Sequence, residues 1–277
     1  MTSALLPEIP APGFSFGNFE RNEHLVEKGF KPPRTFSTGT TICGAIFDGG
    51  VVFGADTRAT GGSIVADKKA DKIHRLASNL VFCGAGTSGD LSALENMIKG
   101  HIELHRLNSG KEVPICVATT KISQHLFRYQ GHLGCALVLG GVDKFGSHLC
   151  HIYPHGSITK LMFASMGSGS LAAMSHLELN YRQKMPLEEA KLLVRNAILA
   201  GIENDLASGN SIDICIVTKG KIEHIRGYDI PKSAIAAKKQ GVYRFAIGTT
   251  PLLESNVKYE EEETIERQLD PDRFMET

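Results

Sequence analysis

The order of strand-like and helix-like segments constrains the fold of this chain more than any other sequence feature. Segments with apolar residues at helical spacing come in two pairs, 90–107 with 114–129 and 170–181 with 187–206. Alternating or continuous apolar segments typical of strands precede, separate and follow these pairs, at 41–47, 50–55, 72–76, 79–86, 134–143, 147–154, 161–167, 211–218 and 221–228. Consecutive hairpins favour antiparallel sheets, and paired helices favour outer layers. The pattern therefore predicts an α/β (α+β) fold, a four-layer α/β/β/α sandwich of two antiparallel sheets.

The patterned region has clear limits within the 277 residues. Residues 1–39 are rich in Pro, Gly, Phe and charge and keep no strand or helix period, so we expect a leader there. Residues 40–230 hold the periodic segments, and a 42% hydrophobic composition is ample for one sizeable core. Residues 231–277 turn polar and predict an extended C-terminal arm.

Composition excludes several classes of partner. The formal net charge is zero, from 30 basic and 30 acidic residues, and no basic block indicates nucleic acid. No apolar run approaches the roughly 20 residues that span a bilayer, and the N-terminus lacks a signal pattern. The six cysteines form no CxxC motif and mostly lie in apolar runs, which indicates buried thiols in a reducing compartment rather than disulfides or a metal site. We expect a soluble intracellular protein without a membrane partner.

Two motifs suggest other functions on weaker grounds. "GAGTSG", residues 84–89, matches GxGxxG and lies between a predicted strand and helix, which keeps a nucleotide-dependent oxidoreductase as an alternative. A second helix follows, however, instead of the parallel strand that a dinucleotide site requires. His101 and His105 are one helical turn apart, but Glu103 is not next to His101 as in HExxH zinc sites.

The first strand begins abruptly after Gly39, with Thr40 and Thr41, far from the start of the chain. A cut between Gly39 and Thr40 would give Thr40 a free α-amine beside its hydroxyl. The pKa of an α-amine is ordinarily about 8, so it can take the proton of the hydroxyl, and one residue would supply nucleophile and base. The uncut amide is not basic, so the leader would keep such an enzyme inactive. Gly39 has no Cβ to hinder attack on its carbonyl.

A family resemblance supports this interpretation. "TTICGAIFDGGVVFGADTRAT", "ADKIH", "FCGAGTSGD", "FRYQGHLGCALVLGGVD", "YPHGS", "MGSGSLAAM" and "AGIENDLASGNSIDICIV" resemble a proteasome β subunit, most closely the trypsin-like class. The resemblance implies the N-terminal-nucleophile hydrolase fold and a threonine endopeptidase of the 20S core that needs no cofactor. It implies self-cleavage at Gly39–Thr40, stacked rings with other α and β subunits, unfolded or ubiquitin-targeted polypeptide substrates, and a place in cytoplasm and nucleus.

The resemblance also implies a catalytic set. Thr40 matches the nucleophile, Lys72 the lysine that depresses the pKa of the amine, and Asp56 the acid that orients this lysine. Gly86 matches the residue whose backbone N–H faces the developing oxyanion. Ser168 matches the serine near the amine, and Asp205 and Ser208 match the remaining pair. Taken alone, each of these residues could be a turn, cap or surface residue. The catalytic assignment rests on their joint occurrence in the order and spacing of the family.

The substrate pocket that the resemblance implies departs from its class at one position. The implied substrate-binding residues are Ala59, Thr60, Ala70, His74, Gly84, Ser88 and Ser92. Gly84 predicts a deep pocket, which suits a long side chain. The class usually carries an acid at position 92, where this chain has a serine that, with Glu95, also fits a capping box. We therefore expect a weakened preference for Lys and Arg.

One alternative within the family is a non-catalytic structural ring subunit that retains its propeptide. It predicts a broken catalytic set, such as a missing threonine or lysine, and neither is missing here.

Overall fold

The computed structural model describes residues 17–30 and 38–231. The order of elements within these ranges follows the predicted pattern closely. The elements are α1 Gly17–Glu27, β1 Thr41–Phe47, β2 Gly50–Asp56, β3 Ala59–Gly61, β4 Ile64–Asp67, β5 Ile73–Arg75, β6 Leu80–Gly86, α2 Ser88–Ser109, α3 Ile115–Arg128, β7 Cys135–Asp143, β8 Gly146–Ile152, β9 Ile158–Lys160, β10 Phe163–Gly167, α4 Ser170–Asn180, α5 Leu187–Asn204, β11 Ile212–Thr218 and β12 Lys221–Asp229.

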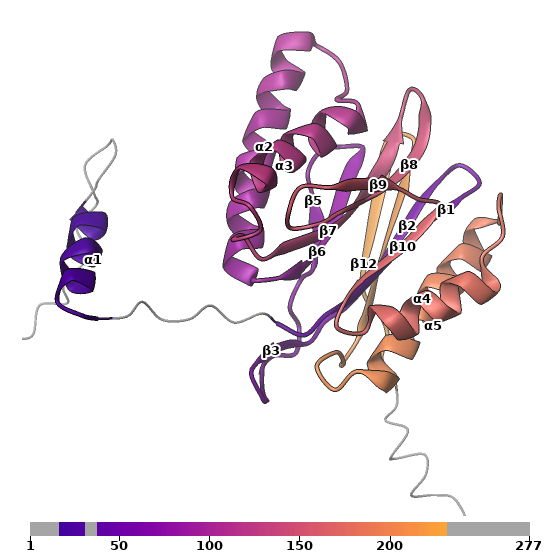
Figure 1. Cartoon of the computed structure of the whole chain (residues 1–277). Coiled ribbons are helices and arrows are strands. Elements are labelled where there is room, and N and C mark those ends of the chain that lie inside the picture. Colours follow the sequence, from indigo (N-terminus) through magenta and orange to yellow (C-terminus); the bar gives the residue numbers. More distant parts are fainter. Residues whose placement is uncertain (1–16, 31–37, 232–277) are drawn as a thin grey trace, which may run out of the picture. The chain divides into compact units, whose positions relative to one another are not determined.

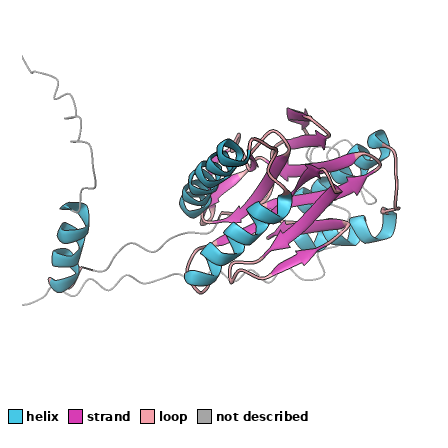
Figure 2. Cartoon of the chain, turned by 90° about the horizontal axis from the view of Figure 1, so that it is seen from above, coloured by secondary structure: helices cyan, strands magenta, loops and turns pink. Residues whose placement is uncertain are grey.

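Two five-stranded antiparallel sheets form the centre of residues 38–231. Their strand orders are β10-β1-β2-β11-β12 and β5-β6-β7-β8-β9. Helices α2 and α3 cover the outer face of the second sheet, and α4 and α5 cover the first (Figure 1). Figure 2 shows the helices and strands of this region in separate colours, turned by 90° from Figure 1. The predicted α/β/β/α sandwich is confirmed.

Three apolar clusters fill the spaces between these layers. One lies between the sheets and includes Ile42, Phe53 and Val138. The other two lie between each sheet and its helices, and Leu137 and Ile98 belong to the cluster under α2 and α3. Because a central strand is covered on both faces, its sequence reads as a continuous apolar run rather than an alternating one.

The predicted hairpin at the start of the sandwich is present. β1 and β2 pair antiparallel, with Phe47 opposite Gly50 beside the turn. Gly49 has φ +98°, a left-handed conformation that glycine adopts without steric cost. The hairpin places the N-terminal end of β1 next to the C-terminal end of β2, so Thr40 and Asp56 lie at the same end of these two adjacent strands.

The structure differs from the sequence prediction in two places. Helix α1, Gly17–Glu27, lies in a leader segment that we predicted to be irregular, and its side chains from Glu20 onward are exposed, so no buried apolar stripe marks it. Strands β3, β4 and β9 were missed because their three or four residues are mostly exposed, so no apolar period marks them. Residues 1–16 and 31–37 of the predicted leader and 232–277 of the predicted arm lie outside the described residues. Within the described ranges, no helix combines the length and hydropathy needed to cross a membrane.

Candidate active site

Thr40 lies directly before β1, and its surroundings converge on the carbonyl of the preceding residue. Thr40 is 1% exposed. Its Oγ1 donates to the Gly39 carbonyl oxygen at 2.7 Å, and the Lys72 Nζ donates to the same oxygen at 2.9 Å. The chain is uncut here, so the Thr40 nitrogen is an amide, and it donates to Ser168 Oγ at 3.1 Å. A hydroxyl and an ammonium group thus both contact the carbonyl group of the predicted cleavage bond.

Lys72 is held by a buried carboxylate. Its Nζ lies 2.7 Å from Asp56 Oδ1, and the two side chains are 7% and 0% exposed. Asp56 also accepts hydrogen bonds from the backbone N–H groups of Thr41 and Gly209, at 2.8 and 3.0 Å. Burial lowers the pKa of Lys72 and raises the pKa of Asp56, and the contact between them opposes both shifts. The buried carboxylate of Asp56 thus holds the Lys72 side chain beside the Gly39 carbonyl oxygen.

A second group of polar side chains lies on the other side of Thr40. Asp205 Oδ2 accepts from the hydroxyls of Ser168 and Ser208, at 2.5 and 2.7 Å. Burial raises the pKa of Asp205, but the bonds from Ser168 and Ser208, with a smaller contribution from the Lys72 charge, outweigh it and leave the pKa below its usual value. Ser168 Oγ also contacts the Thr40 carbonyl oxygen at 3.2 Å. The structure therefore brings together Thr40, Asp56, Lys72, Ser168, Asp205 and Ser208.

Gly86, at the end of β6, lies beside the segment that precedes the predicted cleavage bond. Its φ is +130°, and a Cβ there would lie 1.9 Å from the Gly134 carbonyl oxygen, so only glycine fits. The Gly86 carbonyl oxygen accepts from the backbone N–H of Thr38 at 3.1 Å. Thr60 Oγ1 accepts from the Gly39 N–H at 3.0 Å on the other side of this segment. The role of the Gly86 N–H group at an oxyanion stays a prediction.

The other predicted pocket residues fall into two groups. Ala59 and Thr60 belong to β3, and Ala70 donates its N–H to Thr57 at 3.0 Å beside that strand. His74 on β5 and Gly84 on β6 lie beside helix α2, which carries Ser88 and Ser92, both exposed. His74 stacks on Phe82, with ring centroids 4.9 Å apart, and its Nδ1 lies 2.8 Å from Glu95 Oε2.

Two expectations about this pocket are wrong. A Cβ built on Gly84 would lie 2.7 Å from Leu91 Cδ2, so Leu91 fills the space that Gly84 leaves, and the pocket is not deepened there. Ser92 and Glu95 form no capping box, because α2 already begins at Ser88 with Thr87 as its N-cap residue. Glu95 instead contacts His74 and Lys99.

Thr41 is a site residue that the sequence analysis missed. Its Oγ1 lies 2.7 Å from Ser208 Oγ, and its N–H bonds Asp56, so it joins the two polar groups beside Thr40. Its side chain packs against Gly169 and Gly201, where an added Cβ would lie 2.0 and 2.4 Å from Thr41 atoms. The signal was present as the second threonine of Gly-Thr-Thr, but its partners are distant in sequence.

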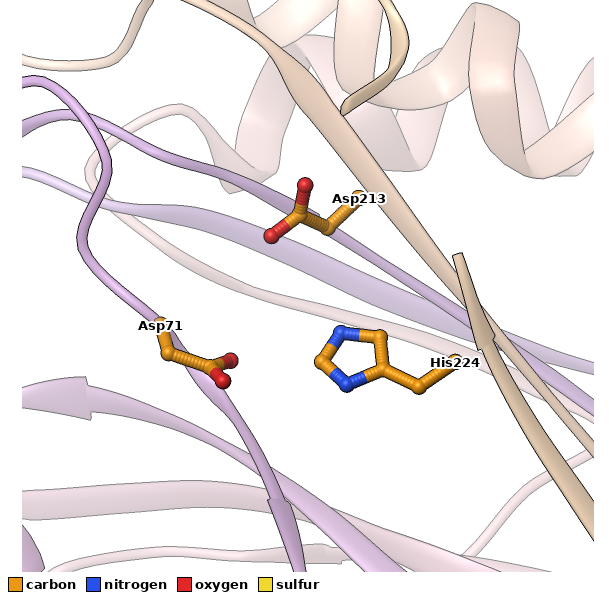
Figure 3. Close-up of side chains that lie close together, drawn as sticks. All are labelled: Asp71, Asp213 and His224. Carbon is orange, nitrogen blue, oxygen red and sulfur yellow. The ribbon is translucent and has the colours of Figure 1, made fainter. Parts of the chain in front are cut away.

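A cluster of potential metal ligands lies apart from Thr40. Asp71, Asp213 and His224 each offer one ligand atom within 4.8 Å of the others, and their side chains point toward one another (Figure 3). Arg226 lies 2.9 Å from Asp71 and 3.0 Å from Asp213, so a guanidinium group already neutralises these carboxylates. We therefore interpret the cluster as an ion-pair network.

The structure contradicts the nucleotide-binding alternative. The GxGxxG segment runs from β6 into α2, but β6 pairs antiparallel with both β5 and β7. The parallel crossover of a dinucleotide site is therefore missing from the described residues around this motif.

Comparisons with known proteins agree with this fold. The family model described as "Proteasome subunit" matches residues 36–217. Proteasome subunit beta type-7-A of Arabidopsis thaliana is 48% identical over 261 residues, 92% of this chain and 95% of that protein. Proteasome subunit beta type-2 of Saccharomyces cerevisiae is 45% identical (88% and 94% covered), and beta type-10 of Mus musculus is 44% identical (90% and 91%). The chain belongs to the proteasome β-subunit family.

Proposed function

We propose that this chain is a catalytic β subunit of the 20S proteasome core, a threonine endopeptidase that becomes active by cutting its own Gly39–Thr40 bond. Residues 1–39 act as a propeptide, 40–230 as the catalytic domain and 231–277 as an arm that contacts other subunits. The chain assembles with other α and β subunits in stacked rings, in cytoplasm and nucleus. It hydrolyses unfolded or ubiquitin-targeted polypeptides without a cofactor.

The observation that carries this proposal is the pair of contacts on the Gly39 carbonyl oxygen, from Thr40 Oγ1 at 2.7 Å and Lys72 Nζ at 2.9 Å. In self-cleavage, the Thr40 oxygen attacks the Gly39 carbonyl carbon, and the Lys72 ammonium stabilises the oxyanion. The C–N bond then breaks, the Thr40 nitrogen takes up the proton lost by the hydroxyl, and Gly39 is left as an ester on Oγ1. Water hydrolyses this ester and leaves a Gly39 carboxylate and a Thr40 amine.

The same groups serve substrate hydrolysis after the cut. The Thr40 amine takes the hydroxyl proton as Oγ1 attacks the substrate carbonyl, and passes it to the leaving amine. The acyl ester is then hydrolysed by water. Lys72 keeps the amine neutral through its charge, and Asp56 holds Lys72 in place. Ser168 already contacts the Thr40 nitrogen and is positioned to orient the amine.

The competing function is a structural ring subunit that keeps residues 1–39. It predicts a defect in the polar groups around Thr40. Among the described residues, Thr40, Lys72 and Asp56 form a connected set of contacts, which favours the catalytic function.

The N-terminal sequence and intact mass of this chain, taken from assembled particles, test the proposal. We expect a chain that begins at Thr40. Thr40→Ala should retain residues 1–39, whereas Thr159→Ala, an exposed threonine on β9, should be cut normally. A wild-type chain that still carries residues 1–39 in finished particles would establish the structural role.

We also propose that the preference for Lys and Arg is weakened, because Ser92 supplies no charge at the position where the class usually has an acid. Ser92→Asp should raise cleavage after Arg relative to cleavage after Leu, measured with fluorogenic peptides. Particles that carry Thr40→Ala give the background cleavage by other subunits, which is subtracted.

A further inference from the structure

The contact between Gly84 and Leu91 closes one side of the predicted substrate pocket. Gly84 lies on the face of β6 that packs under helix α2, on the same side as Phe82 and Leu80. A Cβ at Gly84 would lie 2.7 and 3.0 Å from the two δ carbons of Leu91, and the three nearest atoms all belong to Leu91. Leu91 is 7% exposed, so its side chain is packed into this space rather than directed into solvent.

Two carboxylates of α2 lie near this contact, and among the described residues only Glu95 is paired with a basic side chain. Asp90 Oδ2 accepts from the Gly134 N–H at 2.9 Å. Glu95 lies 2.6 Å from Lys99 Nζ and 2.8 Å from His74 Nδ1, and its side chain is only 15% exposed. A substrate cation would have to displace Lys99 or His74 to reach Glu95.

We propose that Leu91 is a specificity-determining residue: it forms the floor of the pocket at Gly84, so the site accepts a short, uncharged side chain before the bond to be cut. The inference rests on the proposed function, because it names the substrate class of that site. A branched residue such as Val fills a shallow pocket. A Lys or Arg side chain would bring its charge against the apolar Leu91, and burying a charge against an apolar side chain is costly.

The test uses electrophilic peptides on assembled particles, because other subunits also cleave peptides. Three vinyl sulfone peptides, identical except for a terminal Val, Leu or Arg, are incubated with the particles. The mass added to this chain at Thr40 is then followed with time. We expect Val to label fastest and Arg at least about tenfold more slowly.

Leu91→Ala should raise the Leu/Val labelling ratio by about fivefold or more, because it reopens the space over Gly84. Leu94→Ala is the matched control. Leu94 is buried on the same helix and truncation leaves a similar hole, but it supplies none of the atoms nearest Gly84, so the ratio should stay unchanged. Leu91→Val should change the Leu/Val labelling ratio less, in the same direction. This variant replaces Leu91→Ala if the alanine variant does not assemble.

Three results separate the possible failures. Fastest labelling by the Arg peptide overturns the inference while the catalytic function stands. Equal ratios in Leu91→Ala and Leu94→Ala remove Leu91 as the determinant. If no peptide labels Thr40 of a correctly cut chain, the proposed function fails, and the inference fails with it.

Discussion

Two neighbouring residues, Asp71 and Lys72, belong to two very different ion-pair clusters. Lys72 pairs with Asp56 beside Thr40, where the side chains are 7% and 0% exposed. Asp71 pairs with Arg226 on the β11–β12 side, where the side chains are 50% and 39% exposed. Both distances are short, at 2.7 and 2.9 Å, so geometry alone does not distinguish the two pairs.

Burial is what separates them. An exposed pair exchanges contacts with water and is screened by salt, so it contributes little to stability. A buried pair has already lost its hydration, so removing one partner leaves an uncompensated charge. The Lys72 pair is therefore sensitive to substitution and able to shift pKa values, whereas the Asp71 pair is tolerant.

Of the changes that test this difference between the two ion pairs, loss of Lys72 should lower the stability of the chain most. Lys72→Met leaves Asp56 buried without its cation, and we expect the free energy of unfolding to fall by about 3–5 kcal/mol. The Gly39–Thr40 bond should also stay uncut. The control Asp71→Asn removes one partner of the exposed Asp71–Arg226 pair, so it should cost less than about 1 kcal/mol and should leave the cut unaffected.

Urea unfolding of the full-length chain and intact mass from particles check both variants. Equal costs for Lys72→Met and Asp71→Asn would contradict the assigned importance of burial.

Added salt should also distinguish the two ion pairs, through a smaller change in their coupling energies. Double-mutant cycles on Asp56–Lys72 and Asp71–Arg226 measure their coupling energies at about 0.05 and 0.5 M NaCl. The Asp71–Arg226 coupling should be below about 1 kcal/mol and should weaken with salt. The Asp56–Lys72 coupling should not change measurably. A salt-independent Asp71–Arg226 coupling would show that this pair is not screened by solvent.

The pH dependence of stability should have opposite signs at two aspartates. The pKa of Asp205 lies below its usual value, so its contribution is present above about pH 4 and is lost as pH falls. Burial raises the pKa of Asp213, despite its bond to Gly227 and the Arg226 charge, so its contribution is present at low pH and is lost as pH rises.

Unfolding of the wild type, Asp205→Asn and Asp213→Asn between pH 3.5 and 7 checks these signs. The stability of the wild type relative to Asp205→Asn should rise with pH, and relative to Asp213→Asn it should fall. Two differences of the same sign would refute one of the two directions.

Added zinc or a chelator should have the smallest effect. Because Arg226 already contacts Asp71 and Asp213, neither treatment should shift the unfolding temperature of the full-length chain. Arg226→Ala is the informative comparison, since it frees Asp71, Asp213 and His224. A zinc-dependent rise in the wild type would show that the cation displaces Arg226.

The sequence was sufficient for the layers but not for the short elements. The segments 41–47 and 187–206 are long enough for their periods to be clear, and they became β1 and α5 almost unchanged. Strand β9 has three exposed residues, and α1 has exposed side chains from Glu20 onward, so neither carries a burial pattern. A strand or helix shows an apolar period in its sequence only when one of its faces is buried against another element. These segments bury little of their surface, so they show no period.

The site shows the same division. The order of motifs identified Thr40, Lys72 and Asp56 through a family resemblance, and Thr40 also through its chemistry as a strand-initial residue after glycine. The bonds of Thr41 to Ser208 and Asp56 join residues 167 and 15 positions apart, which no local pattern records. Ser92 and Glu95 were predicted to cap a helix, but the helix begins one turn earlier.

The sequence by itself determined the four-layer sandwich and the family, because periodicity and ordered motifs are local properties of a chain. The family resemblance then named most of the residues that gather around Thr40, but not Thr41. Only the tertiary structure decided that Lys72 is buried while Asp71 is exposed, and that Leu91 fills the space over Gly84. Both depend on which helix or strand packs against a residue, and it is packing that removes water from a charge and fills the volume left by a missing side chain.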